Sequence, residues 1–116
     1  MPGVSVVIPC HPPHVGRLAE CVRSVSRQTL PPSEIIVALS STSPESAADL
    51  LPQLQQAAGG IPVRLSLVAG AANAAQNRNR GMHAARHPIV SFFDADDIMR
   101  RQRLARVVAL MEEHAA

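Results

Sequence analysis

The stretch that decides the fold is Val4-Ser5-Val6-Val7-Ile8, which Pro9 stops. It is apolar apart from one serine and rich in β-branched residues, as is typical of a strand buried inside a sheet. Two further apolar runs, Glu34-Ile35-Ile36-Val37-Ala38-Leu39 and residues 89–93, repeat this pattern. Buried strands of this kind indicate a parallel sheet whose faces are covered by helices.

The rest of the chain alternates with these strands. Apolar residues recur at helical spacing in four stretches, which are 15–30, 43–58, 73–86 and 104–111. Val63, Leu65 and Leu67 alternate with polar residues, so we expect a strand that is wet on one face and lies at an edge. Strand–helix units with short connections predict an α/β fold, a Rossmann-like three-layer αβα sandwich with a mainly parallel sheet of about four strands. We expect a single domain over residues 1–116.

The amino-acid composition excludes several classes of function. Hydrophobic residues make up 47% of the 116 and charged residues 17%, which is typical of a globular protein with a real core. The chain has two Phe and no Trp or Tyr, so it lacks the aromatic platforms that bind single-stranded nucleic acid. Its eleven basic residues are all Arg, which excludes a lysine Schiff base. The net charge of +2 fits a small anionic ligand better than a nucleic acid.

The cysteine content and the hydropathy indicate the cellular compartment of the protein. Cys10 and Cys21 are too few for a disulfide framework, so we expect reduced thiols. No run approaches the ~20 apolar residues of a membrane span, and the run at 4–8 is too short for a signal peptide. We therefore expect a cytoplasmic protein without a transmembrane segment.

An acidic cluster directly follows the strand at 89–93. Asp94, Asp96 and Asp97 hold a third of the chain's nine acidic residues. Side chains at a strand end alternate with period two, so Asp94 and Asp96 face the same rim of the sheet. Like charges this close favour a divalent cation, and parallel sheets bind ligands at the carboxyl ends of their strands. The pattern indicates a metal that bridges the phosphates of a ligand, with an acidic cap of the next helix as the alternative.

Two further clusters carry ligand-type side chains. Arg78 and Asn79 lie in Gln76-Asn77-Arg78-Asn79-Arg80-Gly81, where one helical turn can hold a diphosphate or a base edge, or face solvent. Cys10-His11-Pro12-Pro13-His14 contains zinc-type ligands, but their spacing does not match the usual paired arrangements. We interpret this second cluster as a loop with satisfied histidines.

Several segments together resemble one family. They are Val4-Ser5-Val6-Val7-Ile8-Pro9, Ser24-Val25-Ser26-Arg27-Gln28-Thr29-Leu30-Pro31, Glu34-Ile35-Ile36-Val37, Asn77-Arg78-Asn79-Arg80-Gly81 and Ser91-Phe92-Phe93-Asp94-Ala95-Asp96-Asp97. In this order they resemble the N-terminal, nucleotide-sugar-binding half of the family 2 glycosyltransferases, which have the GT-A fold. The last two resemble the family's Ala-Arg-Asn-x-Gly segment and its Phe-Leu-Asp-x-Asp-Asp signature.

The resemblance implies a metal and a reaction. Asp94 and Asp96, with Asp97 beside them, would coordinate Mg²⁺ or Mn²⁺ bound to the diphosphate of a nucleotide-sugar donor. The sugar would pass to an acceptor hydroxyl while the metal stabilises the departing diphosphate.

The resemblance also implies which residues line the nucleotide pocket. Pro9, Cys10 and His11 would form its wall at the end of the first strand. Arg78 and Asn79 would lie near the base or the phosphates.

The family's strand order is third, second, first, fourth. The strand at 89–93 would then be an open edge, and it has no charge or proline inside it to protect that edge. We therefore expect a homodimer joined near this strand or the last helix.

The chain departs from the family's pattern in two places. The acidic run after the second strand, where an Asp usually reads the base, is replaced by Ala38-Leu39-Ser40-Ser41-Thr42-Ser43, with no acid before Glu45. The chain also ends at Ala116, before the family's acceptor site and catalytic carboxylate, so we assign no catalytic residue and expect poor transfer by this chain alone. The alternative hypothesis is a non-catalytic nucleotide- or metal-binding module, or an assembly module.

Overall fold

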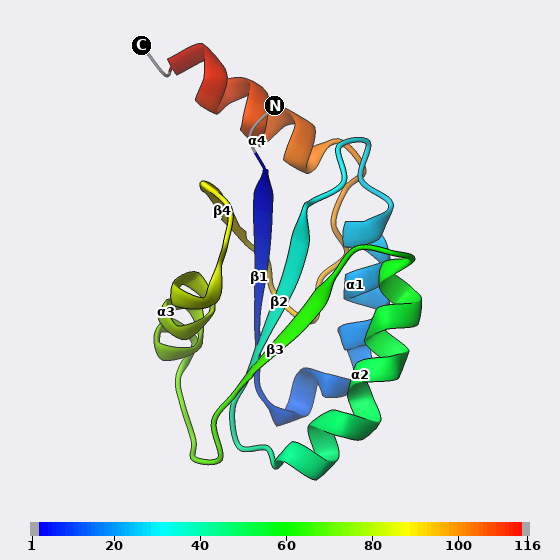
Figure 1. Cartoon of the computed structure of the whole chain (residues 1–116), viewed down its shortest axis with the longest axis vertical. Helices are drawn as coiled ribbons and strands as arrows, with labels where there is room; N and C mark the ends of the chain where they lie inside the picture. The colour runs from blue at the N-terminus through cyan, green and yellow to red at the C-terminus, as the bar shows by residue number, and fades with distance from the viewer. Residues whose placement is uncertain (1–2, 115–116) are drawn as a thin grey trace.

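The computed structural model describes residues 3–114, except for the side chains of residues 12–14. Within residues 3–114, four strands form one parallel sheet in the order β3-β2-β1-β4 (Figure 1). They are β1 (Val4–Cys10), β2 (Glu34–Leu39), β3 (Val63–Leu67) and β4 (Ile89–Phe92). The α/β class, the parallel pairing and the strand order confirm the prediction from the sequence.

Helices cover both faces of this sheet. The helices of the described residues are the 3₁₀ helix η1 (Pro12–Arg17), α1 (Leu18–Ser26), α2 (Pro44–Ala58), α3 (Ala74–Ala84) and α4 (Arg103–His114). Figure 1 shows α1 and α2 on one side of the sheet and α3 on the other, which gives three layers in the described part of the chain. Within residues 3–114, no helix is long and apolar enough to cross a membrane. A cytoplasmic location stays a prediction.

Helix boundaries differ from the predicted ones where hydrogen bonds are redirected. The helix predicted to reach residue 30 ends as α1 at Ser26, because the main-chain N–H of Thr29 donates instead to the carbonyl of Arg101 (2.7 Å). The helix predicted from residue 73 begins after Asn73, which caps it. The Asn73 side chain accepts from the Gln76 N–H, and the Gln76 side chain accepts from the Asn73 N–H.

The two central strands form the middle of the core. Val6, Val7 and Ile8 of β1 are 0% exposed, and every residue of β2 is buried. A strand that is covered on both faces needs apolar residues at successive positions, which explains the continuous apolar runs in the sequence. β3 is only partly buried after Val63, as its edge position requires.

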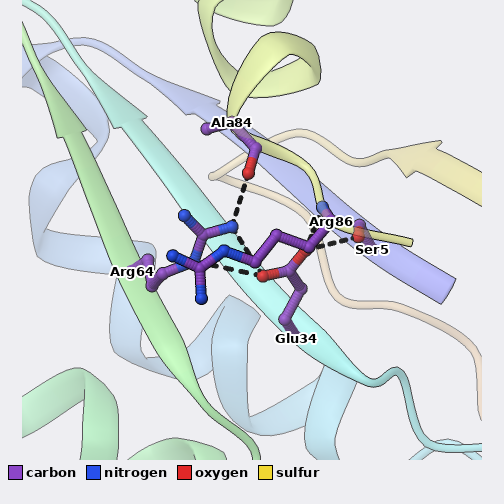
Figure 2. A network of polar contacts seen from close by, with 5 residues as sticks. All are labelled: Ser5, Glu34, Arg64, Ala84 and Arg86. Atoms are coloured by element: carbon purple, nitrogen blue, oxygen red, sulfur yellow. Dashed lines mark hydrogen bonds and ion pairs between the residues drawn. The ribbon is translucent and has the colours of Figure 1, made fainter. Parts of the chain in front are cut away.

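A polar network joins the strands near their amino ends (Figure 2). The Glu34 carboxylate, at the start of β2, accepts from Ser5 Oγ (2.6 Å), from Arg64 Nη2 (2.7 Å) and from the main-chain N–H of Arg86 (2.7 Å). Arg64 also donates to the carbonyl of Ala84 at the end of α3. Burial acts to raise the pKa of Glu34, but these hydrogen bonds and the charge of Arg64 outweigh it and lower the pKa. The ionised Glu34 carboxylate therefore connects β1, β2 and β3, and Arg64 extends the network to the end of α3.

Candidate functional site

The site lies where the sheet changes its winding direction. From β1 the chain crosses to β2 on one side, whereas β4 pairs with β1 on the other side, and α1 and α3 cover opposite faces (Figure 1). In open α/β sheets ligands bind at this switch point, outside the carboxyl ends of the strands. A cavity of about 280 Å³ lies there. Its lining comes from three segments, namely Pro9, Cys10 and His11, then Ala72, Ala74 and Asn77, and finally Asp94, Ala95 and Asp96.

The acidic segment follows β4 as a tight turn. Phe93, one residue beyond β4, still donates to the carbonyl of Val7 (3.0 Å), and Asp97 donates its N–H back to the carbonyl of Asp94 (3.1 Å). Ala95 is 1% exposed, and its side chain packs in the core and so anchors the turn. Asp94 and Asp96 flank it, are exposed and line the same cavity, as their alternation predicted.

Asp97 lies apart from this pair. It lines a separate groove of about 660 Å³, together with residues between the turn and α4. Arg100, Arg101, Arg103 and Arg106 border this groove, and the guanidinium of Arg103 lies 5.0 Å from the centre of the Phe93 ring. The structure therefore brings two of the three predicted metal ligands into one cavity and leaves the third in the neighbouring groove.

The donor set of the cavity suits a cation that a ligand also binds. Among the described residues, no group of three or more His, Cys, Asp or Glu side chains is arranged to hold a metal by itself. Magnesium-type sites usually combine one or two carboxylates with the phosphates of a substrate. Asp94 and Asp96 offer this set, so the residues present fit a metal that arrives with a diphosphate.

The end of α1 holds the segment that follows the acidic turn. Ser24 Oγ accepts from the N–H of Met99 (2.8 Å), and Gln28 Oε1 accepts from the N–H of Leu104 (3.1 Å). Gln28 Nε2 donates to the carbonyl of Arg100 (2.7 Å). The segment around Ser24 and Gln28, which sequence analysis used only as a sign of resemblance, thus positions the polypeptide between the acidic turn and α4.

Cys21 connects the same helix to the acidic turn. Its thiol donates to the main-chain carbonyl of Asp94, with Sγ and O 3.4 Å apart. Burial raises the pKa of Cys21 to about 12, and burial followed by the negative charge of Asp96 raises that of Cys10 to about 11. Both are free thiols within residues 3–114, as predicted. The side chain of His14, another zinc-type residue of this loop, lies outside the described residues.

The residues of the predicted cluster on α3 have different surroundings in the structure. Among the described residues, the lining of the cavity includes neither Arg78, which is partly exposed, nor Asn79, which is exposed. Arg80 has a structural role, because its Nη2 donates to the carbonyl of Leu39 (2.9 Å) and its Nε to Ser66 Oγ (3.0 Å). Burial lowers the pKa of Arg80. It holds the carboxyl ends of β2 and β3 against α3.

Asn77 is the site residue that sequence analysis missed. It is 2% exposed, lines the cavity, and donates from Nδ2 to Ser40 Oγ (3.2 Å). Its Oδ1 is the single buried side-chain oxygen or nitrogen without a hydrogen-bond partner among the described residues. Such an acceptor costs about 1–3 kcal/mol when it stays unmet. The available signal was its place one turn before Gly81, on the helix face that meets the sheet.

Comparison with sequence families identifies one match. The sequence profile described as glycosyl transferase family 2 matches residues 5–116. No curated protein sequence matches the chain.

Solved structures share the fold. The mannosyltransferase PcManGT from Pyrobaculum calidifontis, in complex with GDP-Man and Mn²⁺, has a TM-score of 0.79 at 21% identity, over 95% of this chain and 32% of PcManGT. S. aureus TarS 1–349, in complex with UDP-GlcNAc, has a TM-score of 0.74 at 20% identity, over 97% of this chain and 32% of that one. The chain therefore spans about a third of these structures. At such identities the likeness shows the fold, which is the predicted GT-A type.

Proposed function

We propose a function from one premise: the chain belongs to glycosyl transferase family 2. In this proposal the cavity binds a nucleotide-sugar donor, and the carboxylates of Asp94 and Asp96 would hold a divalent metal that arrives with the donor's diphosphate. The observation that carries the proposal is that these two carboxylates line one cavity at the switch point of the sheet. The reaction served is transfer of the sugar to an acceptor hydroxyl.

The ligands of the structural neighbours narrow the choice of nucleotide-sugar donor. PcManGT is in complex with GDP-Man and Mn²⁺, and TarS 1–349 with UDP-GlcNAc. We therefore propose a uridine or guanosine diphosphate sugar, with Mn²⁺ or Mg²⁺. Both cations prefer the oxygen ligands that two carboxylates and a diphosphate supply together.

Each residue of the acidic turn has its own part in this proposal. The metal, when bound, stabilises the negative charge of the departing diphosphate. Asp94 and Asp96 would hold it, and the buried Ala95 keeps their main chain in place. Asp97, in the neighbouring groove, adds negative charge near the metal without sharing the cavity.

The nucleotide occupies the rest of the cavity. Pro9, Cys10 and His11 form the wall at the end of β1. Arg78 and Asn79 stand outside this wall on α3, and we assign them to the diphosphate as it enters rather than to the base.

Titration calorimetry of UDP and GDP with the chain tests the proposal. We expect binding that requires Mn²⁺ and that Asp96→Asn weakens by more than about tenfold, since even indirect partners of a metal are worth that much. Asp97→Asn is the matched variant, and we expect a clearly smaller loss from it. Equal losses would contradict the division of roles, and failure of both nucleotides to bind with Mn²⁺ would contradict the function.

We also propose that the chain pairs with a second copy of itself near β4 or α4. Among the described residues, β4 has a strand neighbour only on its β1 side, and Val90 and Phe92 are half-buried. An apolar edge of this kind favours strand pairing. Light scattering at micromolar concentration is expected to give twice the chain mass, and a strict monomer would contradict the pairing.

A further inference from the structure

The carbonyl oxygen of Asn77 is a buried acceptor beside the candidate cavity. The side chain is 98% buried, its Nδ2 is engaged by Ser40, and its Oδ1 has no partner among the described residues. An amide oxygen takes a hydrogen bond only from N–H or O–H groups. It therefore does not complement a diphosphate, whose oxygens are acceptors.

The strand order places Asn77 away from the acidic turn. Its partner Ser40 directly follows β2, whereas Asp94 and Asp96 follow β4, and β1 lies between these strands. Two strand spacings separate the two ends of this rim by roughly 10 Å. A nucleotide whose diphosphate is held through a metal at Asp94 and Asp96 thus extends its base towards β2.

Ser40 fixes the amide of Asn77 in this orientation. Its hydroxyl oxygen accepts from Asn77 Nδ2, and Ser40 itself is buried and does not line the candidate cavity. The pair therefore offers the cavity one acceptor, Asn77 Oδ1. Uracil carries a ring N–H at N3 and guanine carries one at N1, and either is a complementary donor.

We propose that Asn77, held by Ser40, selects the base by accepting at Oδ1 a hydrogen bond from the ring N–H of the base, N3–H of uracil or N1–H of guanine. This inference rests on the proposed nucleotide function and adds a specificity-determining residue to it. It also explains how a chain whose segment 38–43 carries no acid can recognise a base. The acceptor comes from α3 instead of from the end of β2.

Methylated nucleotides test the inference on the unmodified chain. UDP is compared with N3-methyl-UDP, and GDP with N1-methyl-GDP, by calorimetry with Mn²⁺. We expect the methylated form of the preferred nucleotide to bind about tenfold more weakly, the worth of one hydrogen bond. Equal binding of both members of each pair would overturn the inference.

The variant Asn77→Leu provides a second test, because leucine has a similar side-chain volume but no hydrogen-bond acceptor. We expect this variant to lose the discrimination between UDP and N3-methyl-UDP while its affinity for Mn²⁺-pyrophosphate stays within about twofold of the original. The matched control is Gln55→Leu, an exposed amide on α2 across the sheet, which should keep the discrimination. A variant of Asn77 that weakens pyrophosphate and UDP equally would show a structural role and overturn the inference.

Three outcomes separate the possible reasons for failure. If 2′-deoxy-UDP binds more weakly than UDP only when Asn77 is present, the ribose hydroxyl is the donor and the base assignment is wrong. If the unmodified chain binds neither UDP nor GDP with Mn²⁺, the proposed function fails and this inference with it. Binding of UDP without sensitivity to methylation overturns the inference alone.

Discussion

Gly81 of α3 lies directly against Val7 of β1. A Cβ added to Gly81 would come within 2.3 Å of Cγ1 of Val7, closer than any ordinary contact. The missing side chain lets α3 approach the sheet, and the same helix carries Asn77 one turn earlier. The glycine therefore sets the height of Asn77 above the cavity.

Gly81→Ala is expected to lower stability. The new methyl group must displace Val7, which is 0% exposed in a packed core, so we expect a loss of about 1–3 kcal/mol in the free energy of unfolding. Urea denaturation measures it. Gly16→Ala is the control, because a Cβ at Gly16 meets open space in the described part of the chain, and we expect a change within about 0.5 kcal/mol. Similar losses in both variants would contradict the close approach.

Glu34→Gln is expected to destabilise the chain and to flatten its acid dependence. The variant weakens charge-assisted hydrogen bonds from Ser5 and Arg64, worth roughly 2 kcal/mol together. The folded state lowers the pKa of Glu34, so its contribution is complete above the ordinary glutamate pKa of about 4.3 and is lost as the pH falls below that value through the folded pKa.

Unfolding curves measured from pH 7 downwards test this sign. The original chain should lose stability more steeply below about pH 4.3 than Glu34→Gln does. Glu113→Gln, at an exposed position near the end of α4, should keep the original slope. If the free energy of unfolding falls equally steeply below about pH 4.3 in the original chain and in Glu34→Gln, the network in Figure 2 is contradicted.

Gln28→Leu is expected to loosen the segment before α4. It leaves the N–H of Leu104 and the carbonyl of Arg100 without their buried side-chain partner, which costs about 2–3 kcal/mol. Hydrogen exchange at the amide of Leu104 should become faster than in Gln102→Leu, a variant of an exposed side chain that accepts from Arg106 of α4. Unchanged protection of that amide would show that Gln28 does not position the segment.

The two thiols are expected to resist alkylation. With pKa values raised by burial to about 11 for Cys10 and about 12 for Cys21, few molecules carry a thiolate at pH 8. We expect iodoacetamide to react at least about a hundredfold more slowly with the folded chain than with the chain in urea. Cys10 should react before Cys21, because it lines the cavity and has the lower pKa. Comparable rates in the two states would contradict the burial of the thiols.

The sheet was predictable because its central strands are covered on both faces. Continuous apolar runs such as Val4–Ile8 have few alternatives in a chain that also shows helical periodicity, and the alternation around Val63 indicated the edge. The prediction that Asp94 and Asp96 face the same rim was correct, although these residues lie in a turn and not in the extended strand that the prediction assumed.

Long-range hydrogen bonds were beyond sequence reasoning. Gln28 accepts a hydrogen bond from Leu104, 76 residues further along the chain, and no local sequence pattern indicates such a partner. Asn77 looked like one more polar residue on a helix, since its burial depends on the approach that Gly81 permits. Asp97 separates from Asp96 because the turn closes between Asp94 and Asp97, which the spacing alone does not indicate.

The Glu34 network and the candidate cavity lie at opposite ends of the same strands. Ser5 belongs to the network and Cys10 to the cavity, and the five residue steps between them along β1 span roughly 17 Å. Substitutions that far apart add independently in their effects on stability. Residues around the cavity can therefore change during evolution, and with them what the cavity binds, while the opposite end of the sheet continues to keep the chain folded.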